Sequence, residues 1–549
     1  MSGSITLENR FGVNKMELIS LKYAIFVIVL LVLYYCFPKK YRWYVLLAGS
    51  MAYYVIICKW YVLFIIFTIC TTYGSTIWID KLLKKQNAIV KSHKEDWDRQ
   101  TRKDYKEKGR KKRVAVMLFA LLCNFGILAF LKYIPYAGEL GLLLPLGISF
   151  YTFQSMGYVM DVYREIVEPE KNFLKVALFV SFFPQIIQGP IAIYDKLAGQ
   201  LYEGHSLRLE NLQKGALLVL WGVMKKLVIA DRAVNIINFV MDKPMDFSGT
   251  YVFFAAVVYA LQLYADFSGG IDIVRGIAEM FGITMSTNFN HPYFSRSLTE
   301  YWHRWHMTLG DWCRNYIFYP LSISKRFLNF GKWLKPRFGA HISKVLPGCI
   351  ASVITFIVIG VWHGANMKYL YFGLWNGIVI MLAELFAPVN KKVAGGFFKL
   401  TGLREKGIFA TIVSVLWTFM LILVGYYFDI AANASTAFHM LFKSVTDFHI
   451  SELGINNIIL NLGACGLDEY DILLLIICTL LWFFISFVEE NKKLDMRDFI
   501  LSRKLPLRWA IIYLGIFIVI IFGYYGPGVN PADFVYMPVS YTHLRAHET

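Results

Sequence analysis

Two histidines, His306 and His363, are the residues of this sequence best suited to acid–base chemistry. His306 lies in Tyr-Trp-His-Arg-Trp-His-Met-Thr-Leu (301 to 309), and His363 lies in Gly-Val-Trp-His-Gly-Ala-Asn (360 to 366). Apolar stretches surround both blocks, and ionisable side chains in such surroundings often mark functional sites. An unperturbed imidazole titrates near about pH 6.5, so either ring could take the proton of an attacking hydroxyl at neutral pH.

A structural role is the alternative for both histidines. On residue type alone, each ring could instead accept or donate a hydrogen bond that anchors a helix. Gly360 and Gly364 flank His363 and would let a substrate approach the backbone closely. Asn366 could hold an imidazole or an acyl oxygen by a hydrogen bond. The residue types alone leave catalysis and structure open.

Several other catalytic motifs are missing from the sequence. It contains no Gly-x-Ser-x-Gly, so a serine nucleophile of the α/β-hydrolase type is not expected. It contains no His-Glu-x-x-His, and His303 with His306 has no evident third ligand, so we expect no metal site. His306 and Asp311 resemble the short His-x-x-x-x-Asp signature of glycerol-phosphate acyltransferases, a weak match with two fixed positions.

Composition places the chain in a membrane. Of its 549 residues, 57% are hydrophobic and only 17% are charged, against about 25% charged in soluble proteins. The net charge of +18 sits mostly in short segments between apolar runs. This distribution fits the positive-inside rule and contact with anionic lipids better than nucleic-acid binding. The eight cysteines are scattered, as expected for buried apolar residues rather than disulfides.

Apolar runs of spanning length recur along the chain and predict an all-α protein with roughly 11–13 membrane segments. The runs lie near 21–37, 43–58, 60–79, 114–133, 142–160, 215–230, 250–268, 346–362, 368–387, 408–428, 471–488 and 509–526. Pro184 and the pair Gly189-Pro190 interrupt a further run at 173–194, which predicts a re-entrant or short-helix segment, or a kinked span. Residues 298–318 have the spacing of an amphipathic helix at an interface or cavity mouth.

The charges between the apolar runs predict the orientation. Residues 80–113 hold 14 Lys or Arg against six acids, and 321–345 is also basic, so both should be cytoplasmic. Residues 429–470 hold one Lys and five acids and should form an external loop. Residues 346–387 then form a hairpin with His363 near its turn, toward the outer half of the bilayer. The first apolar run lacks a cleavage pattern, so we expect it to remain.

Several motifs together resemble the membrane-bound O-acyltransferase (MBOAT) family. They are the two histidine blocks, 57 residues apart, Asn-His-Pro-Tyr-Phe-Ser-Arg-Ser (290–297), Ser-Phe-Phe-Pro-Gln-Ile-Ile-Gln-Gly-Pro (181–190) and Tyr-Ala-Asp-Phe-Ser-Gly (264–269). The pattern is most similar to bacterial proteins of alginate O-acetylation and D-alanyl-lipoteichoic-acid formation. It extends to about Met537 and implies helices around a central acyl-transfer tunnel.

The resemblance implies an enzyme, an acyltransferase of class EC 2.3.1, in the bacterial inner membrane. We expect it to move an acyl group, most simply acetyl, from acyl-CoA or an acyl carrier protein toward hydroxyls of an exported cell-envelope polysaccharide. No bound cofactor is expected, and the resemblance implies an extracytoplasmic SGNH-type partner. D-alanyl transfer to teichoic acid is an alternative. A transporter or lipid flippase is another, although the sequence shows none of the internal repeats common in carriers.

The resemblance also assigns roles to individual residues. We expect His363 to act as the general base and His306 as its partner. Asn366, with Trp305 and Trp362, which immediately precede the two histidines, should contact the substrate.

The C-terminal residues depart from the family pattern. Similar proteins end in Phe-x-Tyr-x-Phe, whereas Pro538 stands here where the last Phe would be. Residues 538–549 show no apolar periodicity and look like a foreign reading frame, so we hypothesise a single membrane domain over 1–537 and a non-native tail. By the predicted topology Tyr536 lies outside, where it could relay the acyl group or serve as an interfacial aromatic anchor.

Overall fold

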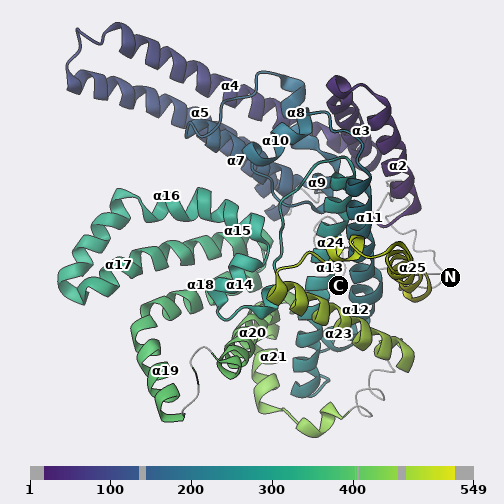
Figure 1. Cartoon of the computed structure of the whole chain (residues 1–549). Helices are drawn as coiled ribbons and strands as arrows, with labels where there is room; N and C mark the ends of the chain where they lie inside the picture. Colours follow the sequence, from purple (N-terminus) through teal and green to yellow (C-terminus); the bar gives the residue numbers. More distant parts are fainter. Residues whose placement is uncertain are drawn as a thin grey trace, which may run out of the picture. The chain divides into compact units, whose positions relative to one another are not determined.

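The computed structural model describes residues 18–134, 142, 144–401, 404, 407–454, 465–525 and 534. Within this part every regular element is a helix (Figure 1), which confirms the all-α prediction. The described residues form two compact units, one from residues 18–219 and Gly270–Ser286, the other from Leu220–Gly269 and residues 287–534. Two helices, α11 (Leu209–Met224) and α13 (Gly249–Met280), contribute residues to both units.

The first unit contains most of the N-terminal helices. They are α2 (Leu21–Cys36), η1 (Lys39–Tyr41), α3 (Arg42–Cys58), η2 (Lys59–Tyr61), α4 (Val62–Ser92), α5 (Arg99–Tyr133), α7 (Ile148–Tyr163), α8 (Phe173–Ser181), α9 (Phe183–Gln188) and α10 (Tyr194–Tyr202).

The long helices α4 and α5 lie side by side and form a hairpin (Figure 1). Asp98 caps α5 by accepting a hydrogen bond from the Thr101 N–H at 3.0 Å. Gly109 allows the close approach, since a Cβ there would lie 1.9 Å from the side-chain oxygen of Gln86. The basic segment 80–113 is therefore largely helical, and the side of the membrane that it faces stays a prediction.

The interrupted run 173–194 forms two short helices, as one of the sequence interpretations predicted. Phe182 interrupts the helical conformation between α8 and α9, because its ψ of 112° is not helical. The freed backbone groups find partners in the protein: the Phe183 N–H donates to Ser50 Oγ at 3.1 Å, and Gln185 Nε2 donates to the Pro190 carbonyl at 3.0 Å. Non-helical backbone at membrane depth needs such internal partners.

Seven helices of the described part are long and apolar enough to cross a membrane, or up to eight if the bent pair Met367–Leu385 and Ala387–Thr401 is one span. The longest candidate, Lys39–Ser92, contains two of the predicted runs. Two shorter apolar helices, Leu21–Cys36 and Phe173–Gln188, coincide with other predicted runs. The chain is therefore a multi-pass membrane protein.

The second unit holds both histidine blocks. Its elements are η3 (Lys225–Ala230), α12 (Asp231–Met241), η4 (Pro292–Phe294), α14 (Leu298–Arg304), α15 (Met307–Cys313), η5 (Arg314–Phe318), α16 (Tyr319–Ser322), α17 (Lys325–His363), α18 (Met367–Leu385), α19 (Ala387–Thr401), α20 (Ile408–Ile430), α21 (Ala434–Thr446), η6 (Ile450–Leu453), α23 (Glu469–Lys492), α24 (Met496–Leu501) and α25 (Leu505–Phe522).

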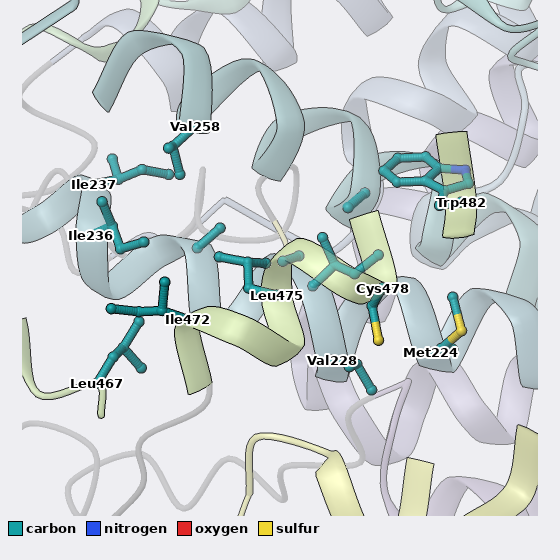
Figure 2. Packing of buried hydrophobic residues seen from close by; sticks show 14 residues of the cluster. Met224, Val228, Ile236, Ile237, Val258, Leu467, Ile472, Leu475, Cys478 and Trp482 are labelled. Atoms are coloured by element: carbon teal, nitrogen blue, oxygen red, sulfur yellow. The ribbon is translucent and has the colours of Figure 1, made fainter. Parts of the chain in front are cut away.

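A buried apolar cluster holds α23 against η3, α12 and α13 (Figure 2). Leu475 and Cys478 of α23 lie near Val228 of η3, and Trp482 closes one end of the cluster. Because α13 and α23 are both candidate membrane spans, van der Waals packing between these side chains, rather than their transfer out of water, holds the helices together. The cluster thereby fixes α13, which carries Phe267 beside the buried histidine described below.

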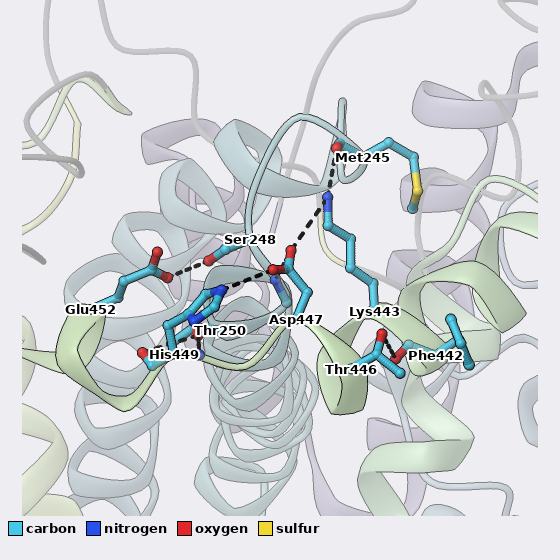
Figure 3. A network of polar contacts seen from close by, with 10 residues as sticks. Met245, Ser248, Thr250, Phe442, Lys443, Thr446, Asp447, His449 and Glu452 are labelled. Atoms are coloured by element: carbon cyan, nitrogen blue, oxygen red, sulfur yellow. Dashed lines mark hydrogen bonds and ion pairs between the residues drawn. The ribbon is translucent and has the colours of Figure 1, made fainter.

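Polar contacts fasten the start of α13 to the segment after α21 (Figure 3). Thr250 and His449 exchange hydrogen bonds, in which the His449 N–H donates to Thr250 Oγ1 at 2.7 Å and Thr250 Oγ1 donates to the His449 carbonyl at 3.3 Å. Asp447 Oδ2 accepts from the Gly249 N–H at 3.3 Å, and Lys443 donates to the Met245 carbonyl at 2.7 Å. Residues 443–449 of the predicted external loop 429–470 are therefore held against the start of α13 and the residues just before it.

Candidate functional site

His306 lies at a break in the region predicted as one amphipathic helix. That prediction of a continuous helix over 298–318 was wrong, because α14 ends at Arg304 and α15 begins at Met307. His306 has φ 42° and ψ 51°, in the left-handed region. Backbone bonds to a separate segment explain the break: the Met307 N–H donates to the Asn288 carbonyl at 2.9 Å, and the Asn290 N–H donates to the Arg304 carbonyl at 3.0 Å.

The side chain of Asn288 lies against the His306 ring. Asn288 Oδ1 is 3.2 Å from His306 Nδ1. The same oxygen accepts from the Thr308 backbone N–H at 3.1 Å and from Thr308 Oγ1 at 2.9 Å. All three residues are buried. One amide oxygen thus joins the imidazole to the first turn of α15.

Burial keeps the His306 ring neutral. Only 2% of the residue is exposed, and desolvation, with a smaller contribution from the nearby His363, lowers the pKa of His306 to about 3. The Phe267 ring lies edge-on to it, with ring centroids 4.9 Å apart. A neutral imidazole has one nitrogen that donates and one that accepts a hydrogen bond.

His363 is the last residue of α17, at the turn between α17 and α18, which confirms the predicted hairpin. The two glycines around His363 serve the packing of this hairpin. A Cβ at Gly360 would lie 2.2 Å from the Tyr369 carbonyl, and one at Gly364 would lie 2.5 Å from the Tyr369 ring. The interpretation that they leave room for a substrate was therefore wrong, since Tyr369 fills that space.

Trp362 brings the two histidines into one site. Its ring centroid lies 6.2 Å from that of His306 and 4.8 Å from that of His363. His363 is half-buried and also stacks on Tyr369, with centroids 6.0 Å apart. The site thus combines one fully buried imidazole with one that is partly accessible.

Asn366 and Trp305, the other residues predicted to contact substrate, have structural contacts. Asn366 caps α18: its Oδ1 accepts from the Lys368 N–H at 3.1 Å, and its Nδ2 donates to the Ala432 carbonyl at 3.3 Å. Trp305 is buried among aromatic rings, including Phe289 at 5.0 Å and Tyr301 at 5.6 Å between centroids. Contact of either residue with substrate stays a prediction.

Hydrogen bonds between side chains attach α14, which precedes His306, to α18 and α20. Trp302 Nε1 donates to Asn376 Oδ1 of α18 at 3.0 Å. The Tyr301 hydroxyl lies 2.8 Å from that of Tyr426 in α20. These bonds fix the chain on which His306 is carried relative to the α17–α18 hairpin.

Other predicted features can be placed or set aside. In the part of the chain that the structure describes, no group of three His, Cys, Asp or Glu residues is arranged to hold a metal ion. His303 is exposed whereas His306 is buried, so the two rings differ in environment. Tyr536 and the tail 538–549 lie outside the described residues. Sequence reasoning missed Asn288 as a site residue, although it begins the polar Asn-Phe-Asn-His stretch.

The chain is similar in sequence to several known proteins. Over 315 residues the chain is 30% identical to a probable alginate O-acetylase of Pseudomonas syringae pv. tomato, covering 57% of this chain and 54% of that protein. It is 30% identical over 314 residues to a peptidoglycan O-acetyltransferase of Helicobacter pylori, covering 50% of this chain and 56% of that protein. A teichoic acid D-alanyltransferase of Bacillus subtilis is 26% identical over 288 residues, covering 51% and 67%.

The chain spans little more than half the length of the first two relatives. Residues 169–335 match the model of the membrane-bound O-acyltransferase family, and this region includes Asn288 and His306. The chain is therefore similar to the membrane-bound O-acyltransferase family over residues 169–335, and to alginate and peptidoglycan O-acetylating proteins and teichoic acid D-alanyltransferases over about half of its length.

Proposed function

We propose that the protein is an O-acyltransferase of the bacterial inner membrane that transfers an acetyl group toward hydroxyls of an exported cell-envelope polysaccharide. The observation that carries the proposal is the meeting of His306 and His363 around Trp362 within a multi-pass membrane protein. The names of the relatives support acyl transfer to polymers of this kind. The donor is a cytoplasmic thioester, either acyl-CoA or an acylated carrier protein.

In the proposed reaction the acceptor hydroxyl attacks the thioester carbonyl. A C–O bond forms, the hydroxyl proton passes to His363, the C–S bond breaks, and the departing thiolate takes up a proton. Because a thiolate leaves readily, the protein mainly needs to orient the donor, accept the hydroxyl proton and stabilise the oxyanion. His363 suits the base because it is half-buried and so reachable by a substrate, and His306 is its partner.

Substrate contacts are proposed for Trp362, which touches both histidine rings, and for Trp305 and Asn366 beside them. We also propose that an extracytoplasmic SGNH-type protein completes delivery to the polysaccharide, with Tyr536 as a relay for the acyl group. The second candidate is D-alanyl transfer to teichoic acid, which the Bacillus subtilis relative favours.

Acyl transfer in membrane vesicles tests the proposal. Vesicles receive labelled acetyl-CoA or a labelled acyl carrier protein, and label on the polysaccharide is measured. His363→Ala should lower the rate by about 100- to 10,000-fold, the usual contribution of a general base, and His306→Ala should also cause a severe loss. D-alanyl label on teichoic acid, with no acetyl transfer, would favour the second candidate.

Two exposed histidines close in sequence to the site provide controls. His341 lies on α17 and is exposed, and His303 lies on α14 and is exposed. His341→Ala and His303→Ala should keep near wild-type activity. Monodispersity in detergent must match wild type for all four variants. A well-folded His363→Ala protein with normal acyl transfer would contradict the assignment of the base.

A further inference from the structure

The side-chain amide of Asn288 has only one acceptable orientation. The Thr308 backbone N–H can only donate, and it lies 3.1 Å from the atom assigned as Asn288 Oδ1. Turning the amide over would place an NH₂ group against this N–H, so two donors would face each other. The observed orientation holds although the buried Nδ2 of Asn288 has no hydrogen-bond partner in the described part of the chain. Thr308 therefore determines which end of the amide meets His306.

This orientation decides where the proton of the His306 ring lies. Asn288 Oδ1 carries no hydrogen, so its 3.2 Å contact with His306 Nδ1 is a hydrogen bond only if Nδ1 is the donor. In a neutral imidazole the other nitrogen, Nε2, then has a lone pair and no proton. We propose that Asn288 is a positioning residue that holds His306 in the Nδ1-protonated neutral form, so that Nε2 is a fixed acceptor in the site.

The inference rests on the proposed acyl transfer and refines the division of work between the two histidines. An Nε2 without a proton cannot donate a hydrogen bond to the oxyanion of the tetrahedral intermediate. It can accept a hydrogen bond or a proton from the reacting groups. His306 therefore acts with His363 on the proton-accepting side of the reaction, and another donor stabilises the oxyanion.

The charged side chains on the helices around His306 are paired with one another, so Asn288 and burial determine the protonation state of the His306 ring. His363, on the facing hairpin, is the ionisable group whose charge acts on His306. On α14, Arg304 is paired with Glu300 at 2.7 Å. On α13, Asp266 is paired with Lys226 at 2.7 Å. A carboxylate placed at position 288 would be a new charge in direct contact with the ring.

Asn288→Asp and Asn288→Leu separate this role from a purely structural one. Aspartate keeps an oxygen for both Thr308 donors and for His306 Nδ1, but its charge favours the imidazolium. An opposite charge at this range raises a histidine pKa by about 1–3 pH units. Activity of Asn288→Asp should therefore fall on acidification at a pH about 1–3 units higher than in wild type. Asn288→Leu should lose about 10- to 100-fold in rate, as for other partners that orient functional histidines.

The proton position itself is read by ¹⁵N NMR of histidine-labelled protein in detergent, with a His306→Gln sample to assign the signal. Wild type should show the Nδ1-protonated neutral form, and Asn288→Leu should shift toward the Nε2-protonated form. A proton on Nε2 in wild type would overturn the inference even in an active enzyme. An unchanged pH profile in a folded Asn288→Asp protein would overturn it as well. Full activity of His306→Ala would instead contradict the proposed function, so the two failures can be told apart.

Discussion

Replacing Lys226 by Met should destabilise the second unit strongly. Lys226 Nζ lies 2.8 Å from Asp231 Oδ1 and 2.7 Å from Asp266 Oδ1, and all three side chains are at most 3% exposed. Two carboxylates thus share one ammonium group away from water. Breaking a buried ion pair on one side costs about 3–5 kcal/mol, because the remaining charge is left without compensation. We expect Lys226→Met to lower the free energy of unfolding by at least this amount.

Replacing Asp231 by Asn should have the opposite effect at neutral pH. Burial raises the pKa of Asp231 from 3.8 to about 6, more than the neighbouring Lys226 lowers it. Each pKa unit corresponds to 1.36 kcal/mol, so ionising this carboxyl in the folded protein costs about 3 kcal/mol. The folded state binds the proton more tightly, so the stability contribution is largest below about pH 4 and falls as pH rises to about 6. Asp231→Asn should lose this pH dependence and equal or exceed wild-type stability at neutral pH.

Thermal unfolding in detergent, followed by tryptophan fluorescence and size-exclusion chromatography, measures both effects. Lys84→Met is the control, because Lys84 is 64% exposed and its pair with Asp80 is at the surface. Such exposed pairs contribute about 0–1 kcal/mol. Two results would refute the reasoning. One is a wild-type Tm for Lys226→Met, and the other is a decrease in Tm for Asp231→Asn as large as that for Lys226→Met.

Three further predictions concern the hairpin, the orientation and the C-terminus. Gly373→Ala should destabilise the protein by about 1–3 kcal/mol, because the new Cβ would lie 2.3 Å from a backbone oxygen of α17. Gly395→Ala should instead stabilise the protein by about 0.5–1 kcal/mol, because its Cβ would meet nothing within 4 Å. Melting curves of the two variants compare these effects. Single cysteines placed in 85–110 should resist impermeant thiol reagents in intact cells, and those placed in 440–447 should react. The reverse labelling pattern would contradict the predicted orientation. Mass spectrometry should detect an acyl adduct on Tyr536 during turnover, and the Tyr536→Phe variant should lack this adduct. If wild type shows no adduct and Tyr536→Phe is active, Tyr536 is an interfacial anchor and not a relay.

Much of the fold follows from the sequence because it depends on local pattern. Long apolar runs must satisfy their backbone hydrogen bonds within the segment in a membrane, so they predict helices directly. Pro184 and the pair Gly189-Pro190 predicted the interrupted segment, since a proline has no backbone N–H with which to continue a helical hydrogen-bond ladder. The hairpin around His363 follows from the two adjacent apolar runs 346–362 and 368–387 and from the charges of the segments that flank them. The chemical character of the two histidine blocks was also visible in their residue types.

The detailed site depends on contacts between segments that are distant in sequence. The aromatic spacing of 298–318 favours a helix, yet backbone hydrogen bonds to 288–290 place His306 in a left-handed conformation. Helical periodicity carries no information about such pairing. The space beside Gly360 and Gly364 could be assigned only once Tyr369 was placed on the facing helix.

The sequence by itself determined the class of protein, its helices and the two histidines, because apolar length and residue chemistry are local properties. Only the tertiary structure brought both rings to Trp362 and placed Asn288 on the buried one. The same is true of the ammonium group of Lys226, which lies between carboxylates from two different helices. Burial and hydrogen-bond geometry decide which nitrogen of an imidazole carries its proton, and both arise only when separate segments pack together.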